Sequence, residues 1–246
     1  MDILILIVLA IVPAAVCLFL LTRQDKAHPE PKKKLAAAFF AGIGSLLLTL
    51  LITNIFPVNA KEWGMGAIID GLGEAFFEAA IPEEVAKFIC LFLVIWKSKE
   101  FDEYLDGVIY AAFVGMGFAT VENILYVLDN GIGNAILRAF TSVPGHFCDA
   151  VIMGYFFSLA KFDKAHRMSN LFKALFFAIL AHGIYDGLIM VGTGLGDSTF
   201  EVLFALILVV VFIVFNVKIW KLSIRKIKEM VQRDKAGGEA APQKAA

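Results

Sequence analysis

Seven long apolar runs follow one another along the chain, separated by short polar segments. A helix needs about 17 to 25 mostly apolar residues to cross a bilayer. The runs therefore predict seven membrane helices, near residues 3–21, 35–56, 67–96, 105–128, 134–160, 171–192 and 199–220. We expect an all-α fold, a polytopic transmembrane helix bundle formed by residues 1–235 as one domain. The Gly, Ala, Pro and Lys content near the C-terminus predicts a disordered tail at 236–246.

The third and fifth runs are too long for a straight helix perpendicular to the bilayer, and they contain Pro82 and Pro144. Proline removes a backbone donor and clashes with the preceding turn, so we expect a break or kink in both runs. In the third run, Asp70, Glu74 and Glu78 are spaced four apart. This spacing predicts an acidic stripe that faces water or the membrane interface.

Connections rich in Lys and Arg alternate with connections that are almost free of them. The basic segments are 22–34, 97–99, 161–173 and 218–228, and the others are 57–66, 129–133 and 193–199. Short basic loops remain on the cytoplasmic side of a membrane. The alternation predicts an outside N-terminus and a cytoplasmic C-terminus.

Composition agrees with the apolar runs, because 59% of the residues are hydrophobic and the mean hydropathy is +0.78. These values lie outside the soluble range, so the lipid bilayer is the expected surrounding, and we expect no nucleic-acid partner. Cys17, Cys90 and Cys148 lie in apolar runs without a C-x-x-C spacing, and we interpret them as packing residues. The sequence leaves the oligomeric state open.

Ionisable residues inside the runs point to chemistry, because each costs about 2.5 to 3.5 kcal/mol to insert at mid-span. Two others, Asp106 and Arg138, lie near predicted span ends and are set aside. Four spans carry the rest, and we expect these spans to meet at one polar centre. The residues are Glu83, Glu84, Lys87, Glu122, His146, Asp149, His182 and Asp186.

Helical spacing places Glu83 with Lys87, and His182 with Asp186, on shared helix faces. A structural interpretation is available for each pair. Glu83 and Lys87 would form a salt bridge that lowers the insertion cost, although Glu84 would then still need a partner. His182 and Asp186 would form a hydrogen-bonded clamp on their helix.

The remaining polar residues also have structural interpretations when taken one at a time. Glu122, next to Asn123, suits an interhelical hydrogen bond, and Asp149 suits a role in orienting His146 one turn away. Four neighbouring spans that carry such residues together favour a functional site over four separate structural features.

The chemistry of this set suits hydrolysis by an activated water molecule. A glutamate is the expected general base. His146 and His182 would stabilise an oxyanion or bind a metal ion such as Zn2+, while Asp149 and Asp186 hold their other nitrogens. The sequence contains no H-E-x-x-H motif, serine protease elbow or phosphate loop.

Together these residues resemble the PrsW family of intramembrane proteases, which we group with the CAAX prenyl endopeptidases and CPBP proteins. The resemblance covers about residues 75–190. The matching motifs are Glu83-Glu84-x-x-Lys87, Phe118-x-x-x-Glu122 followed by Asn123 and Tyr126, His146 after Pro144-Gly145, and His182-x-x-x-Asp186.

The resemblance implies an endopeptidase that cleaves a membrane-anchored protein, such as an anti-sigma factor, in a bacterial or archaeal plasma membrane. It assigns acid/base catalysis to Glu83 and Glu84, water activation to Glu122, and metal binding or oxyanion stabilisation to His146 and His182. The supporting residues are then Lys87, Asn123, Asp149 and Asp186.

Two departures distinguish the chain from the prenyl endopeptidases, which typically have Glu-Glu-x-x-x-Arg and a histidine at the position of Glu122. Lys87 falls one residue short of that arginine position. These differences favour the PrsW branch over a prenyl-protein substrate.

Two other functions use similar residues. A proton- or ion-coupled transporter would use buried Glu, His and Asp as a relay, and many transporters contain inverted repeats, of which we find none in this sequence. A non-catalytic scaffold that binds a partner helix would tolerate replacement of all the site residues.

Overall fold

The computed structural model describes residues 3–25 and 28–240, and within these ranges every regular element is a helix. The α-helices are α1 Ile3–Thr22, α2 Lys32–Ile55, α3 Ala67–Gly73, α4 Ile81–Ile95, α5 Tyr104–Phe140, α6 Ser142–Phe162, α7 Arg167–Thr193 and α8 Thr199–Ala240. A short 3-10 helix, η1, spans Ala60–Trp63, and a π-helix, η2, spans Glu74–Ala80. The all-α expectation is confirmed.

Among the described residues, five helical segments are long and apolar enough to cross a bilayer. They are Ile5–Thr22, Lys32–Trp63, Tyr104–Phe162, Arg167–Thr193 and Thr199–Ala236. The longest contains both α5 and α6, and the run α3–η2–α4 is not among the five. The predicted count of seven spans and the predicted orientation therefore stay predictions.

Helix α5 folds back on itself at Gly131, which has φ 74°. Glycine populates this region at no steric cost. Arg138 hydrogen-bonds Asn123, although residues 15 apart in a straight helix would be about 22 Å apart. Val127 and Ala135 also pack in one cluster. The turn at Gly131 thus agrees with the predicted boundary between the fourth and fifth spans.

The two prolines have different outcomes. In the third run the chain stays helical, and the π-helix η2 ends two residues before Pro82. A wider π turn accommodates a ring that would clash with the carbonyl four residues earlier in an α-helix. Near Pro144 the regular helix does break, at Thr141, which has φ −124° and ψ −71° between α5 and α6.

The acidic stripe holds the segment before α3. Ala60 N–H donates to Glu78 at 2.7 Å, and Met65 N–H donates to Asp70 at 3.0 Å. Glu74 forms an ion pair with Lys61, which lies in the segment before α3, at 3.0 Å. All three carboxylates are partly exposed, and they also hold a loop that would otherwise leave N–H groups unpaired. Whether the stripe faces water or the membrane interface stays a prediction.

Small residues allow helices to approach closely in the middle of the bundle. A Cβ atom at Gly42 of α2 would lie 2.0 Å from the Val114 carbonyl oxygen, and one at Gly117 of α5 would lie 2.0 Å from the Phe39 oxygen. Such contacts are typical of membrane helices. The α2–α5 packing therefore depends on glycine at both positions.

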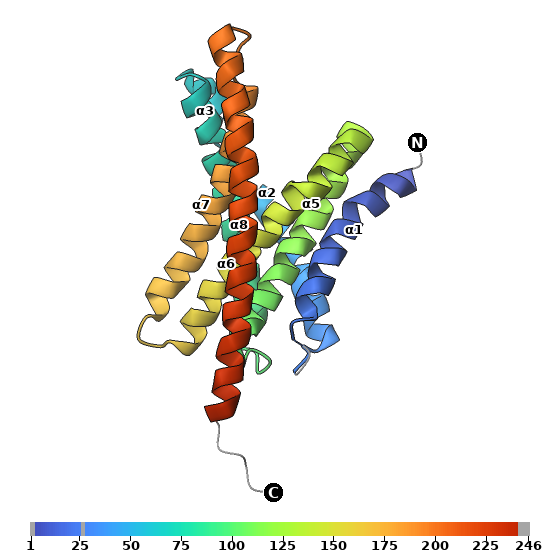
Figure 1. Ribbon diagram of the computed structural model, residues 1–246, viewed down its shortest axis with the longest axis vertical. Helices are drawn as coiled ribbons and strands as arrows, with labels where there is room; N and C mark the ends of the chain where they lie inside the picture. Colours follow the sequence, from blue (N-terminus) through green and yellow to red (C-terminus); the bar gives the residue numbers. More distant parts are fainter. Residues whose placement is uncertain (1–2, 26–27, 241–246) are drawn as a thin grey trace, which may run out of the picture.

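The connections α1–α2, α4–α5 and α6–α7 lie at the end of the molecule where α8 finishes (Figure 1). These are the basic connections of the sequence. Lys161 donates to the Trp96 carbonyl at 2.8 Å, and Lys34 to the Val94 carbonyl at 3.2 Å, so lysines tie this end together.

Helix α8 runs the full height of the molecule (Figure 1) and continues well past the predicted span end at residue 220. Its second half is amphipathic, with Ser223, Ile227 and Met230 buried against the bundle. The first part of the predicted tail, residues 236–240, is helical. Residues 241–246 lie outside the described part, and the disordered tail and single domain stay predictions.

Candidate active site

The α4 helix carries two adjacent carboxylates and an ammonium group into the bundle. Glu83, Glu84 and Lys87 lie in its first two turns, directly after the π-helix. A π segment shifts the faces of the helix that follows it and is frequent at functional sites. The geometry of this helix start therefore determines where the three charged groups point.

Lys87 lies at the centre of the site and is only 3% exposed. Its Nζ donates to Glu83 Oε2 at 3.1 Å and to Glu84 Oε1 at 2.8 Å, and it lies 3.3 Å from His146 Nδ1. Its charge also sits over the Phe118 ring at 3.9 Å. All three donors of the ammonium are thus used, as a buried charge requires.

His182 of α7 lies between two carboxylates. Its Nδ1 is 2.8 Å from Glu84 Oε1, and its Nε2 is 3.0 Å from Asp186 Oδ2. An ionised carboxylate only accepts, so both ring nitrogens carry protons while both acids are ionised. The predicted pairing of His182 with Asp186 is confirmed, and Glu84 is an additional partner.

His146 of α6 connects Lys87 to Glu122 of α5. An ammonium only donates, so Nδ1 of His146 accepts from Lys87, and its Nε2–H donates to Glu122 Oε2 at 2.9 Å. The same oxygen accepts from Arg138 Nη2 at 2.6 Å. Glu122 is therefore held between two donors in this arrangement.

Arg138 belongs to the site, although its place near a predicted span end led us to set it aside. Its Nε donates to Asn123 at 2.8 Å, and its guanidinium lies 4.0 Å from the Tyr126 ring centre. The hairpin at Gly131 brings it back beside Glu122. A lone arginine inside a predicted membrane span was the available signal.

The expected contact between Asp149 and His146 does not form. Both nitrogens of His146 face other groups, and the structure gives the carboxylate of Asp149 no hydrogen bond to this ring. Spacing of three along α6 brings the residues to neighbouring positions, but the ring is rotated towards α4 and α5. Asn123 forms two hydrogen bonds: its Oδ1 accepts from Arg138, and its Nδ2 donates to the Ala10 carbonyl of α1 at 3.1 Å.

A cavity of about 250 Å³ opens beside these residues. Glu83 forms part of its wall, whereas Glu84 and Lys87 lie behind it. The rim includes Leu137 and Ile189, whose exposed side chains face outward from α5 and α7. The polar lining comprises Glu83, Glu122, Tyr126, Asn134, Arg138, Thr141, Ser142, His146, Asp149, His182, Tyr185 and Asp186.

One group of side chains has the donor atoms of a metal site. Glu83, Glu84, His146 and His182 each offer a ligand atom, and these atoms lie within 4.8 Å of one another. Two carboxylates and two imidazoles are suitable Zn2+ ligands. Lys87 already contacts three of these four residues, so its ammonium and a metal ion compete for the same donors.

A polar cavity lined by carboxylates and imidazoles, inside an apolar helical bundle, has the features expected of a membrane-embedded hydrolase. The PrsW family of intramembrane metalloproteases matches residues 30–216. The chain is 34% identical to Protease PrsW of Geobacillus kaustophilus, over 97% of this chain and 95% of that protein. It is 31% identical to the protein of that name from Clostridioides difficile, over 94% and 93%.

Identity to Protease PrsW of Bacillus subtilis is 30%, over 84% of this chain and 86% of that protein. No solved structure matches the chain. The chain belongs to the PrsW family, and it is an integral membrane protein that acts as a peptidase. The fold and the buried polar cavity agree with that activity.

Proposed function

We propose that the chain is an endopeptidase whose general base is Glu83. The observation that supports this role is the position of Glu83 at the cavity wall, where a water molecule and a peptide bond have room. Glu84 is 1% exposed, and its Oε1 lies close to both Lys87 and His182. Glu84 therefore orients these two cations and does not meet substrate.

In the proposed reaction, Glu83 takes a proton from water as the oxygen bonds to the peptide carbonyl carbon. The same carboxyl group then gives the proton to the amide nitrogen as the C–N bond breaks. Glu122, held by Arg138, keeps the Nε2 proton on His146 and leaves Nδ1 with its lone pair. The carbonyl π electrons move onto its oxygen as the new C–O bond forms and return when the C–N bond breaks, and the C–N electron pair leaves with the nitrogen that accepts the proton.

We propose Zn2+ as the metal, held by His146 and His182 with Glu83 or Glu84. The observation in favour is the gathering of these donor atoms within 4.8 Å. Because Glu83 is the proposed base, Glu84 is the carboxylate ligand that leaves Glu83 free for the water. A bound zinc ion would supply Lewis acidity towards the water and the carbonyl. His182 would have to release one ring proton to bind it, and Lys87 would have to withdraw from the carboxylates.

The proposed substrate is a membrane-anchored protein, of the anti-sigma-factor type, in a bacterial plasma membrane. Leu137 is 61% exposed and Ile189 41% exposed at the cavity rim, so the entrance is apolar and suits a segment that arrives from the lipid. The expected grouping with the CAAX prenyl endopeptidases and CPBP proteins is not supported, because the chain matches the PrsW family, which is a separate family.

The test is cleavage of a single-span protein in nanodiscs by Glu83→Gln and Glu84→Gln variants. We expect Glu83→Gln to remove cleavage without lowering the melting temperature, and Glu84→Gln to lower both. Asp197→Asn, an exposed acid of the α7–α8 loop, is the matched control. Full cleavage by the double Glu83→Gln, Glu84→Gln variant would overturn the proposal.

Metal content is measured on the same preparations. We expect about one zinc per chain, with cleavage lost on chelation and restored by zinc. The double variant His146→Ala, His182→Ala should hold no zinc. Cleavage that continues in a metal-free preparation would remove zinc from the proposal and leave Glu83 as the base.

A further inference from the structure

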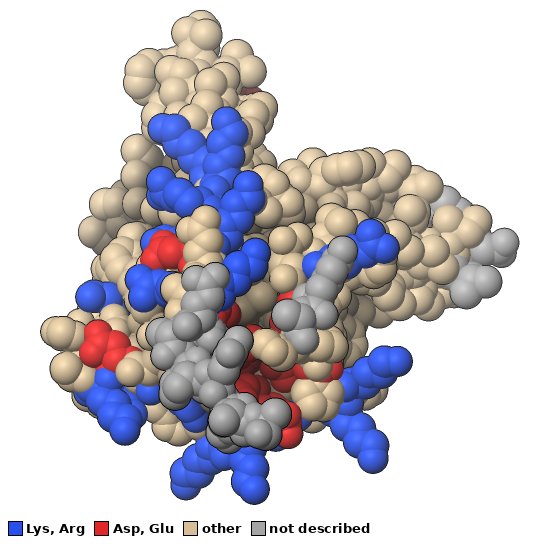
Figure 2. Space-filling model, turned by 60° about the horizontal axis from the view of Figure 1, so that its bottom comes forward, with Lys and Arg blue, Asp and Glu red and all other residues tan. Residues whose placement is uncertain are grey.

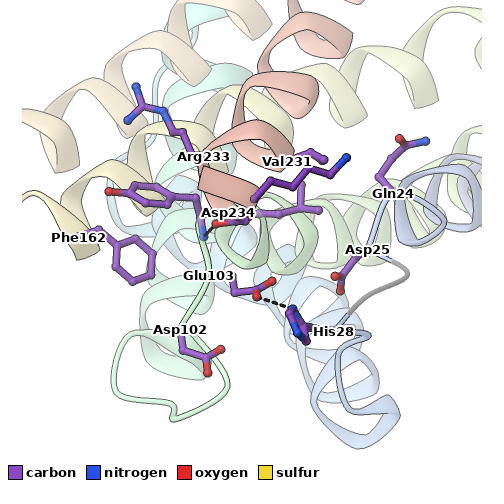
Figure 3. Close-up of a pocket in the computed structure, with 12 residues that line it drawn as sticks. Gln24, Asp25, His28, Asp102, Glu103, Phe162, Val231, Arg233 and Asp234 are labelled. Atoms are coloured by element: carbon purple, nitrogen blue, oxygen red, sulfur yellow. Dashed lines mark hydrogen bonds and ion pairs between the residues drawn. The ribbon is translucent and has the colours of Figure 1, made fainter. Parts of the chain in front are cut away.

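A second polar cavity, of about 420 Å³, lies at the end of the molecule where the basic connections meet. Its wall combines the α1–α2 loop, the α4–α5 loop and the end of α8 (Figure 3). The acidic lining residues are Asp25, Asp102, Glu103 and Asp234. Seen from this end, acidic atoms gather in a hollow with Lys and Arg around it (Figure 2). We call it the loop pocket.

The loop pocket is built by specific contacts between its three segments. Asp234 of α8 accepts hydrogen bonds from the backbone N–H groups of Tyr104 at 2.6 Å and Leu105 at 2.8 Å. It therefore caps the first turn of α5, where a carboxylate is stabilised by unpaired N–H groups. His28 contacts Glu103 at 2.6 Å and joins the α1–α2 loop to the same place.

One carboxylate oxygen of the loop pocket lacks a hydrogen-bond partner among the described residues. Asp25 is only 7% exposed, and its Oδ2 has no hydrogen bond among the described residues. Its carboxylate points towards Glu103 and His28 (Figure 3). Burial raises the pKa of Asp25 and the pKa of Glu103. A buried carboxylate oxygen without a hydrogen bond is costly, and a cation in the pocket would reduce that cost.

Among the described residues, none of the three basic residues of the pocket wall, His28, Arg233 and the exposed Lys235, forms an ion pair with Asp25. Arg233 donates to Glu229 at 3.1 Å, and its guanidinium lies 5.5 Å from the Tyr104 ring centre. His28 is engaged with Glu103. The described acids of the loop pocket therefore outnumber the described cations that are free to pair with them.

The spacing of the acids identifies the size of the ligand. Across the described residues, the only group of three or more donors gathered within 4.8 Å is the active-site group, so the loop pocket does not have the compact donor set of a metal ion. A larger cation with several N–H donors, such as an alkylammonium or guanidinium group, reaches acids on three segments at once.

We propose that the loop pocket binds the Lys or Arg side chains that flank the transmembrane segment of a partner protein. The partner protein is the membrane-anchored substrate, so the identity of the partner rests on the proposed function. Lys and Arg flank membrane spans on the cytoplasmic side, and the loop pocket lies among this chain's own basic connections. Its acids are opposite in charge to the basic segment that such a substrate presents there.

Binding is measured with the Glu83→Gln variant in nanodiscs of zwitterionic lipid, so that cleavage plays no part in the result. The probes are a single-span peptide with Lys-Lys-Arg at one end and the same peptide with three glutamines. We expect the basic peptide to bind about tenfold more tightly, and raised salt to remove the difference. Equal affinities would overturn the proposal.

The pocket is tested by adding Asp25→Asn and Glu103→Gln to the Glu83→Gln chain. We expect this change to abolish the preference for the basic peptide. Adding Glu100→Gln, an exposed acid of the same loop outside the pocket, should preserve it. If the preference survives the pocket changes at an unaltered melting temperature, the assignment is wrong.

Spermidine distinguishes a free polyamine from a protein-borne cation. We expect it to compete with the basic peptide only weakly. If spermidine binds through Asp25 and Glu103 while the two peptides bind equally, the proposal that the pocket binds a partner protein is overturned. Failure of the proteolytic mechanism would be read separately, from cleavage by the chain with Glu83 intact.

Discussion

Arg138 Nη2 lies 2.6 Å from Glu122 Oε2, although the two residues stand on opposite arms of a helical hairpin. The guanidinium and His146 share this one oxygen. Arg138 is thus a positioning residue, which acts on the site by fixing Glu122.

Replacing Arg138 by Gln should lower the cleavage rate strongly, because Glu122 loses its charged partner while it remains buried. Loss of one partner of a buried pair costs about 3–5 kcal/mol. We expect a lower melting temperature, and Arg138→Lys should recover part of it. The check is kcat and KM for a single-span substrate, with exposed Arg225→Gln as the control. Unchanged kcat would refute the positioning role.

The two aspartates near the histidines offer a matched pair. Asp186 contacts His182 Nε2 at 3.0 Å, whereas Asp149 has no contact with His146. Loss of a carboxylate that orients a ligand histidine typically costs about 10- to 100-fold in metal affinity or activity. We expect this loss for Asp186→Asn and a smaller effect for Asp149→Asn, measured as zinc affinity. The reverse order would contradict the geometry.

Lys87 competes with a metal ion for the same carboxylates, so Lys87→Met should make stability depend on metal. Without metal, Glu83 and Glu84 lose their buried cation and the melting temperature should fall. Zinc should then raise it more than in the unchanged chain, because a ligand that binds only the folded state stabilises it. The readout is the melting temperature with chelator and with zinc. An equal zinc response in both chains would show that Lys87 does not compete.

Gly42 and Gly44 are two residues apart on α2 and differ in their surroundings. A Cβ at Gly42 would lie 2.0 Å from the Val114 carbonyl oxygen, whereas nothing lies within 4 Å of one at Gly44. Gly42→Ala should therefore lower the melting temperature. Gly44→Ala should be neutral or raise it, since Ala is about 1 kcal/mol better than Gly inside a helix. Equal behaviour would rule out close α2–α5 packing.

The pH dependence of stability should reveal Asp25. Burial raises its pKa in the folded chain, so the folded state holds this proton more tightly than the unfolded state. Stability from this group is present below the unfolded pKa of about 3.9 and is lost as pH rises through the folded pKa. Asp25→Asn should therefore raise the melting temperature at pH 7 and weaken its pH dependence. Exposed Asp197→Asn should do neither.

The helices and most of the site follow from local patterns, but two features of the site do not. Apolar run lengths predict the elements, and the i,i+4 spacing predicts the pairing of His182 with Asp186. The place of Arg138 depends on a reversal at Gly131, and the direction of the His146 ring depends on neighbours from α4 and α5. These are tertiary properties, which periodicity along one helix does not contain.

The charged residues of α4 also bear on membrane insertion. Each of Glu83, Glu84 and Lys87 would cost about 2.5 to 3.5 kcal/mol in lipid on its own. They pair with one another within α4, but their histidine partners come from α6 and α7, which are synthesised later. We therefore expect this segment to insert poorly through the translocon by itself. We also expect its stable integration to wait for the later helices, so that the active centre and the predicted topology would form in the same step of biogenesis.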